Sequence, residues 1–531
     1  MQIRRLKIDK HRCLVDFNII FTINEDGGSS TILIGENGTG KSTMIQTILD
    51  ILISFDSDAV EKRITYQYEL EYFYKGSIIE IQQSKRQYRI NIDGELFCRG
   101  TMETIKKHLA KAGKSIFPER ISYFYSGQNN SALYSIRRAE DRHNQNCRGL
   151  LAKYWNALYL QNRTYKGEFP KEKYNYCTED LIPVYLLSIL CGQESNEKKL
   201  LREQCHLGEI GTVSVGLSVD RISKRLQNDV VEVGNEGVCD LISFIDDRFA
   251  DLFRNGIIYQ DYDQFFYEIN NIADVEADAI AFFNFFEKLE TLLDAEIEVT
   301  VKVGETFVLS KHLSEGQRQL IKVLGMLGVC KSEDALVLMD EPDAHMNPKW
   351  KYELRTIIED CLSEDGVTNT QAIIATHDPL VINGVPKEFI RIFSHNESIR
   401  QQNGLYVTRV IEPTEDTFGM GIDGLLQSEY YGLRTSYDKK ATDKFVRRQE
   451  LYEKLINKEI SIEEKAELRA LTKEIASMQM SNNSIDFLYD DFIRVFRKTE
   501  YYKKEYMSFD EMQDRRRKIE ETIRALYEGQ V

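Results

Sequence analysis

Residues 31 to 50 contain the first set of side chains that could bind a phosphate. The segment reads TILIGENGTGKSTMIQTILD, and its residues 35–42 fit the pattern G-x-x-x-x-G-K-[ST]. Glycines in such a loop let backbone N–H groups converge on phosphate oxygens, and the helix that follows adds its positive dipole end. Lys41 would reach the phosphate oxygens, while the Ser42 hydroxyl would bind Mg²⁺. The residues expected to contact the nucleotide are Gly35, Asn37, Gly38, Thr39, Gly40, Lys41, Ser42 and Thr43.

Two carboxylates follow an apolar run in the segment LVLMDEP, residues 336–342. Four apolar residues predict a buried strand whose carboxyl end faces the site. Asp340 would hold Mg²⁺ through its water ligands. Glu341 would act as the general base that polarises the water attacking the γ-phosphate. An Asp-Glu pair at a strand end near a turn is common by itself, so the prediction of ATP hydrolysis depends on its combination with the phosphate loop.

The segment LSEGQRQ, residues 313–319, precedes these carboxylates and begins a helix. It resembles the LSGGQ-like signature motif of ABC-type ATPases, with Glu315 in place of the usual first glycine. In that family the motif closes over the γ-phosphate bound by a second subunit. The resemblance implies that Ser314, Gly316 and Gln317 contact nucleotide across a subunit interface, aided by the dipole of the helix. The alternative is an ordinary helix N-cap, which these residue types also favour.

Three further segments agree with this resemblance. Asp343 lies where ABC-type ATPases place the D-loop, which crosses the dimer interface. His377 ends the apolar run AIIATH and corresponds to the switch histidine that senses the γ-phosphate. Gln128 follows the strand-like run ISYFYSG and is a candidate Mg²⁺ or water ligand of the Q-loop type. Arg12 is either a nucleotide contact or a surface arginine.

The fold class expected from this order of motifs is α/β, an ABC-type P-loop ATPase head. It combines a mixed sheet with an antiparallel β layer, because residues 64 to 98 alternate as strand pairs with a hairpin turn expected at Asn91-Ile92-Asp93-Gly94. We expect an ATPase lobe at 1–130, a helical insertion at 131–295 and a second ATPase lobe at 296–410. A charged helical C-terminal region at 411–531 would bind a partner.

The composition limits the other classes of function. The chain has 531 residues, a net charge of −16 and a pI near 5.2, which argues against a general basic coat for nucleic acid. Nine cysteines occur singly and form no CxxC pair, so a zinc ribbon is not expected. No apolar run is long enough to span a membrane, and the N-terminus lacks a signal-peptide core. These observations favour a cytoplasmic protein without a membrane domain.

The subgroup of ABC-type ATPases that this chain resembles is indicated by the segments before, between and after the motifs. The opening MQIRRLKIDKHRCLVDFNIIF, followed by ILIGENGTGKST, resembles the SMC, RecF, RecN and OLD groups. The large insertion between Ser42 and Leu313 argues against a transporter subunit, yet is too short for SMC arms. OLD proteins carry a Toprim nuclease with an Asp-x-Asp after the switch histidine. No strand-like run after His377 ends in such a pair, and the one attractive candidate, Asp261 and Asp263 in the run IIYQDYD, precedes the signature motif and is expected to mark a polar turn.

The histidines form no HNH or HD nuclease pattern, so we expect an ATPase without an effector of its own. In this respect the chain resembles the PtuA ATPases of Septu-type antiphage systems, which also occur in some retron modules. That resemblance implies a head-to-tail homodimer or higher oligomer that binds ATP and Mg²⁺ and regulates a partner HNH nuclease. In a retron setting, a reverse transcriptase and its nucleic acid would also be partners. The alternatives are a DNA-repair or DNA-maintenance ATPase that clamps DNA directly, an OLD-like nuclease ATPase, and a toxin–antitoxin or signalling ATPase.

Overall fold

The structure is a computed structural model. It describes residues 1–24, 27–55, 64–113, 115–127, 133–161, 163–226, 233–261, 264–331, 334–363, 370–400, 406–433, 438–456, 460–477 and 517. Its internal contacts divide the chain into two compact units, Met1–Ser436 and Tyr437–Val531. The two units are described separately below.

A seven-stranded mixed sheet forms the centre of the first unit, in the order β18-β17-β3-β16-β15-β8-β9. Its strands are β3 (Ser29–Gly35), β8 (Arg120–Tyr125), β9 (Tyr174–Tyr176), β15 (Ala335–Asp340), β16 (Gln371–Ala375), β17 (Ile390–Arg400) and β18 (Tyr406–Ile411). All neighbours pair in parallel except β17 and β18, which are antiparallel. The carboxyl ends of β3, β15, β16 and β8 therefore share one edge of the sheet. This edge carries the predicted chemistry.

A six-stranded antiparallel sheet makes up the β layer expected from the sequence, in the order β2-β1-β4-β5-β6-β7. Its strands are β1 (Gln2–His11), β2 (Leu14–Ile20), β4 (Tyr68–Tyr74), β5 (Ser77–Ser84), β6 (Gln87–Ile92) and β7 (Glu95–Gly100), and helix α2 (Met102–Ala112) follows. Asp93 and Gly94 form the tight turn between β6 and β7, with φ values of 50° and 82°. The expected hairpin is therefore present, although Asn91 and Ile92 of the expected turn are the last residues of β6.

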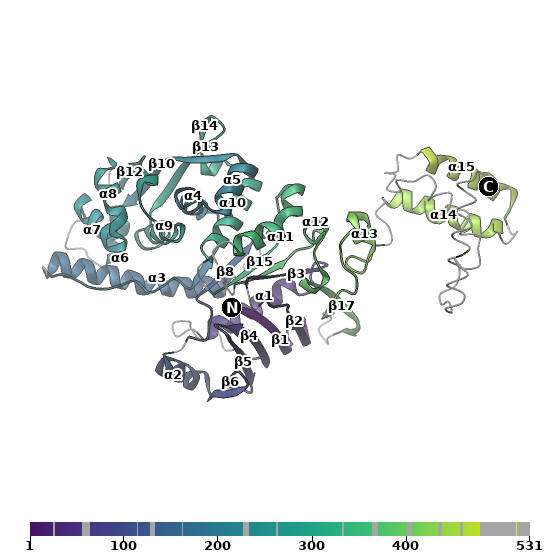
Figure 1. The fold of residues 1–531 in the computed structure, drawn as a ribbon, viewed down its shortest axis with the longest axis horizontal. Helices are drawn as coiled ribbons and strands as arrows, with labels where there is room; N and C mark the ends of the chain where they lie inside the picture. The colour runs from purple at the N-terminus through teal and green to yellow at the C-terminus, as the bar shows by residue number, and fades with distance from the viewer. Residues whose placement is uncertain are drawn as a thin grey trace. The chain divides into compact units, whose positions relative to one another are not determined.

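The two faces of the central sheet pack against different cores because side chains alternate along each strand. Leu33, Leu338 and Ile373 pack with helix α1 (Lys41–Ser54) and the antiparallel layer. Ile34, Val337 and Ile374 join the opposite core, which includes helices α4 (Ile182–Cys191), α9 (Ala279–Leu293), α10 (Glu315–Gly328) and α11 (Pro348–Ser363). Figure 1 shows the purple antiparallel layer on one side of the sheet and the teal helices on the other. The expected α/β ATPase fold is confirmed.

The insertion expected to be helical at 131–295 is mostly helical but also contributes strands. Its helices, apart from α4 and α9, are α3 (Leu133–Trp155), η1 (Asn156–Leu160), α5 (Asn196–Cys205), α6 (Val219–Leu226), α7 (Asn235–Ile245), α8 (Asp247–Asn255) and η2 (Ile272–Asp274). Strands β10 (Leu207–Ser218), β11 (Ile257–Asp261) and β12 (Gln264–Ile269) join β13 (Glu296–Val303) and β14 (Thr306–Leu309) in a sheet ordered β11-β12-β10-β13-β14.

The run TVSVGLS within β10 has the alternating pattern of a strand that is buried on one face. Val213, Val215 and Leu217 alternate with small residues and are buried. Asp261 ends β11 rather than lying in a turn, while Tyr262 and Asp263 fall outside the described residues. The boundaries at 130, 295 and 410 remain predictions.

The remaining elements of the first unit are η3 (Ser310–His312), α12 (Pro379–Ile382), η4 (Lys387–Phe389) and α13 (Gly421–Gln427). The second unit contains α14 (Lys439–Ile456) and α15 (Ile462–Ser477), which pack on one another. Ion pairs such as Arg447–Glu467 link the two helices. Among the described helices, none has both the length and the apolar character required to cross a bilayer.

Candidate functional site

The predicted phosphate loop connects β3 to α1, as the sequence indicates. Gly35 and Gly40 adopt φ values of 141° and 103°, a region that side chains rarely enter. A Cβ on Gly35 would lie 2.1 Å from the Phe393 carbonyl oxygen, and a Cβ on Gly40 would lie 2.6 Å from Thr408 Oγ1. Glycine is thus required here both by backbone conformation and by the close approach of β17 and β18.

The Lys41 side chain folds back over this loop. Its Nζ donates to the carbonyl oxygens of Gly35 at 2.6 Å and Glu36 at 3.1 Å. Burial lowers the pKa of Lys41, and the nearby charges of Asp340 and Glu341 act in the opposite direction. An amine held between a glycine loop and two carboxylates is placed to bind phosphate oxygens.

Asp340 ends β15 directly beside the start of α1. The Ser42 hydroxyl donates a hydrogen bond to the Asp340 carboxylate, so the two predicted metal ligands are in contact. Burial raises the pKa of Asp340 to about 6, opposed by the Ser42 hydrogen bond. Asp340 Oδ2 is buried, and no described residue donates a hydrogen bond to it. A hydroxyl beside a buried carboxylate oxygen without a partner fits a hard cation such as Mg²⁺.

Glu341 lies at the same edge with its backbone in the left-handed region, at a φ of 56°. Its N–H donates to the Ala375 carbonyl oxygen at 2.8 Å, which ties the end of β15 to the end of β16. This turn brings Glu341 Oε1 within 3.3 Å of His377 Nδ1. Both side chains remain accessible to solvent, with 34% and 56% exposed for Glu341 and His377. The predicted base and switch histidine are therefore neighbours, although they are far apart in sequence.

The signature segment starts α10 with its end open to solvent. Ser314 is the exposed N-cap and forms a capping box with Gln317. Gln317 Nε2 donates to the Cys205 carbonyl oxygen at 3.1 Å, so this side chain holds α10 to the end of α5. A Cβ on Gly316 would lie 3.1 Å from the His345 carbonyl oxygen. The described contacts of this segment thus involve α5 and the loop after Glu341, and its role toward a second subunit's nucleotide stays a prediction.

Asp343 and Gln128 differ from the other predicted residues. Asp343 is only 3% exposed, and its carboxylate accepts a hydrogen bond from Thr376. Burial raises the pKa of Asp343. The side chain therefore lies inside its own chain, where it braces the loop between Glu341 and α11. Gln128 falls outside the described residues, but β8 ends beside the site, since Ser126 N–H donates to the Asp340 carbonyl oxygen at 3.3 Å.

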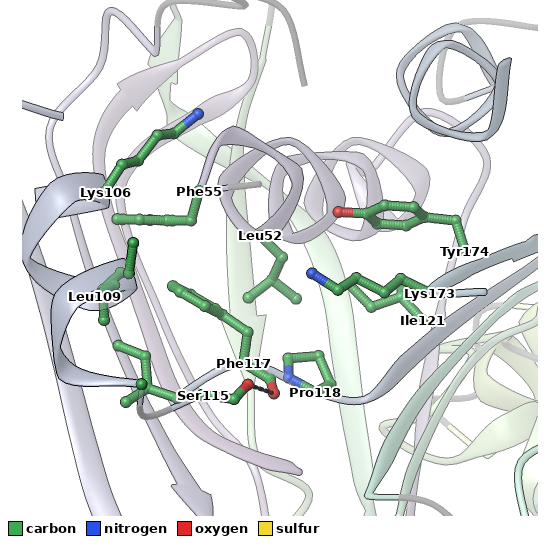
Figure 2. Close-up of a pocket in the computed structure, with 13 residues that line it drawn as sticks. Leu52, Phe55, Lys106, Leu109, Ser115, Phe117, Pro118, Ile121, Lys173 and Tyr174 are labelled. Atoms are coloured by element: carbon green, nitrogen blue, oxygen red, sulfur yellow. Dashed lines mark hydrogen bonds between the residues drawn. The ribbon is translucent and has the colours of Figure 1, made fainter. Parts of the chain in front are cut away.

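A separate cavity of about 300 Å³ lies at the opposite end of α1 (Figure 2). Leu52 of α1 and Phe55, the residue directly after α1, line it together with Phe117, Ile121 and Lys173. The Phe55 and Phe117 rings stack with centroids 5.0 Å apart. Because the phosphate loop leads into the N-terminal end of α1, this cavity is distinct from the candidate ATP site.

Segments of the chain are similar to known proteins. A family model described as "AAA domain, putative AbiEii toxin, Type IV TA system" matches residues 219–383, a segment that includes Ser314, Asp340, Glu341 and His377. "Septu protein PtuA" of Bacillus mycoides (strain KBAB4) is 26% identical over 143 residues, covering 26% of this chain and 18% of that protein. The chain carries an ABC-type ATPase head related to PtuA.

Two other proteins match shorter segments of the chain. "Retron Vc95 probable ATPase" of Vibrio cholerae serotype O1 biovar El Tor is 34% identical over 84 residues, covering 16% of this chain and 14% of that protein. "Protein ea59" of Escherichia phage lambda is 29% identical over 126 residues, covering 24% and 22%. The chain therefore spans less than a quarter of the length of each of these relatives.

Solved structures of ATPase heads also match part of the chain. An SMC head bound to the C-winged helix domain of ScpA has 14% identity and a TM-score of 0.34, covering 78% of this chain and 98% of that chain. The ATP-bound recombination mediator RecF has 14% identity and a TM-score of 0.32, covering 77% and 97%. Both TM-scores are below 0.5, so the fold assignment depends on the sheet order and motif positions instead.

Proposed function

We propose that this protein is a Mg²⁺-dependent ATPase whose turnover regulates a partner effector. The observation that carries the proposal is the meeting of Ser42 and Asp340, with Lys41 and Glu341 at the same sheet edge. Four residues from two distant segments supply a hydroxyl, an amine and two carboxylates in one place. Phosphoryl transfer to water needs this set for metal binding, charge neutralisation and activation of the nucleophile.

Each side chain has a separate task in the proposed reaction. Ser42 and Asp340 would hold Mg²⁺. When bound, this ion would neutralise the negative charge that develops on the phosphate oxygens. The Lys41 amine would leave the Gly35 and Glu36 carbonyls to bind phosphate oxygens. Glu341 would accept a proton from the attacking water. Its contact with His377 would orient the Glu341 carboxylate for this step.

We further propose that two copies assemble head to tail and complete each other's sites. The exposed N-terminus of α10 supports this, since Ser314 and the adjoining backbone present a positive helix end to solvent. Ser314 and Gly316 of one copy would then approach the γ-phosphate held by Lys41 of the other. Gln317 would act indirectly, by fixing the capping box.

The biological setting proposed is bacterial antiphage defence in the cytoplasm. Similarity to proteins named "Septu protein PtuA" and "Retron Vc95 probable ATPase" supports it. The effector would be an HNH nuclease that docks on the helical C-terminal region, joined in a retron by a reverse transcriptase and its nucleic acid. Co-expression with such a nuclease, followed by co-purification and infection assays, would test this step.

Direct DNA clamping is less favoured by the described charges. Lys107 pairs with Glu103 at 2.7 Å, and Arg447 pairs with Glu467 at 2.9 Å. These two basic side chains are thus paired with carboxylates of the protein itself. A DNA-binding assay over a salt series would decide, because phosphate contacts give a steep dependence on salt.

The ATPase proposal is tested with purified full-length protein. Glu341→Gln should abolish turnover and retain ATP binding, and Ser314→Arg should block turnover by obstructing the composite site. Glu296→Gln, at an exposed position on β13, is the matched control and should hydrolyse ATP normally. Normal turnover by Glu341→Gln would rule out the assigned base, and normal turnover by Ser314→Arg would rule out the composite site.

A further inference from the structure

Thr408 on β18 contacts the phosphate loop at Thr39. Its Oγ1 donates to the Thr39 carbonyl oxygen at 2.8 Å, and its backbone N–H donates to the Cys13 carbonyl oxygen at 2.9 Å. The side chain is 5% exposed. One residue therefore joins the central sheet, the β1–β2 turn and the phosphate loop.

The hydrogen bond to Thr39 has a directional consequence for the next amide. A trans peptide unit is planar, so its C=O and N–H point in opposite directions. When Thr408 holds the Thr39 carbonyl toward β18, the Gly40 N–H is turned away from β18. Convergent backbone N–H groups are what a phosphate loop offers its ligand, so this bond sets the direction of one of them.

Steric contact reinforces the same arrangement. A Cβ on Gly40 would lie 2.6 Å from Thr408 Oγ1 and 3.0 Å from Cys13 Sγ. The Gly40 backbone therefore lies so close to β18 that no side chain would fit between them. Pairing of Phe393 on β17 with Gly35 on β3 fixes the other end of the loop to the same pair of strands.

We propose that Thr408 is a positioning residue for ATP binding, which acts by holding the Thr39–Gly40 peptide in its phosphate-binding orientation. The inference rests on the proposed ATPase function. It predicts that loss of the Thr408 hydroxyl weakens nucleotide binding beyond any effect on folding stability.

Thr417 provides a matched control because it is also a buried threonine whose hydroxyl donates to backbone carbonyl oxygens. It is 0% exposed, and its hydroxyl donates to the carbonyl oxygens of Ile382 at 2.9 Å and Val385 at 2.8 Å. Neither acceptor belongs to the phosphate loop. The same substitution at the two positions thus separates loss of a buried hydroxyl from loss of the contact with Thr39.

The experiment compares wild-type protein with Thr408→Val, Thr408→Ser and Thr417→Val in the full chain. ATP affinity is measured by competition against a fluorescent ATP analogue, together with KM, kcat and Tm. Removal of one hydrogen bond worth about 1 kcal/mol should raise Kd and KM about fivefold in Thr408→Val. Thr408→Ser should restore both to within about twofold of wild type, because it keeps the donor. Thr417→Val should lower Tm without changing KM.

The outcomes distinguish the two proposals. If wild type fails to bind ATP, the proposed function is overturned and this inference with it. If wild type binds ATP but Thr408→Val binds equally well, or Thr417→Val raises KM as much, only the positioning role is overturned. Should Thr408→Val fold poorly, Thr408→Ala removes the same donor without adding a methyl group and is read in the same way.

Discussion

Ser42, which lies at the start of α1, hydrogen-bonds Asp340 at the end of β15. The contact arises because β3 and β15 run parallel in one sheet, with β16 between them. Their carboxyl ends therefore reach the same edge, where the helix after β3 begins. This arrangement places a hydroxyl and a buried carboxylate together, which is the feature that a Mg²⁺–nucleotide complex would use.

Asp340→Asn should remove the stabilisation that Mg²⁺ adds in the presence of ATP, without destabilising the protein alone. Burial raises the pKa of Asp340 to about 6, above its ordinary value, so the ionised carboxylate opposes folding and its cost grows as pH rises from about 4 to 6. At pH 8 the neutral amide avoids that cost. We expect a Tm no lower than that of wild type, and no further rise in Tm when Mg²⁺ is added to the variant with ATP already present. A clear further rise on adding Mg²⁺ would show that Asp340 does not hold the metal.

His377→Ala should lower kcat by at least about tenfold while changing ATP affinity little. His377 Nδ1 lies 3.3 Å from Glu341 Oε1, so its loss frees the proposed base to rotate away from the attacking water. The matched control is His108→Ala, in helix α2, which follows the antiparallel layer. Steady-state kinetics and direct ATP binding separate the two effects. A normal kcat in His377→Ala would exclude the orienting role.

Local sequence patterns predicted the parts of the site that depend on neighbouring residues. The Gly-rich loop, the apolar run before Asp340 and the Ser314 N-cap each have a physical signature within a few residues. The β6–β7 turn was also predictable, since Asp93-Gly94 favours the positive φ values observed. Such features depend on local backbone preferences, so they form largely independently of the tertiary contacts around them.

Other features depend on contacts between distant segments and left no such signature. Thr408 sits in the run YVTRV, whose alternation predicts a strand but not a contact with Thr39. Asp343 has the position of a D-loop residue, yet burial against Thr376 makes its carboxylate internal. The strand β10 was missed because its glycines weaken the alternation, while pairing with β12 and β13 stabilises it.

Gly40→Ala should destabilise the phosphate loop more than Gly38→Ala. Both glycines have positive φ, 103° at Gly40 and 81° at Gly38, so alanine is strained at either position by about 1–2 kcal/mol. A Cβ on Gly40 would also meet Thr408 Oγ1 at 2.6 Å, whereas a Cβ on Gly38 would meet nothing within 4 Å. Chemical denaturation should therefore show a larger fall in unfolding free energy for Gly40→Ala. Equal falls would mean that contact with β18 adds nothing to backbone strain.

Glu290→Gln should change how stability depends on pH. Burial raises the pKa of Glu290 on α9 to about 7, with Asp180 and Asp294 adding repulsion, and no described residue hydrogen-bonds its Oε2. Since this pKa is raised in the folded state, the folded protein holds the proton more tightly, and stability falls as pH rises from about 4.5 to 7. The shift corresponds to at most about 3 kcal/mol. Unfolding free energies of wild type and variant, measured between about pH 4 and pH 8, should diverge in favour of the variant by up to this amount. The exposed-site variant Glu296→Gln should run parallel to wild type, and a parallel curve for Glu290→Gln would contradict the prediction.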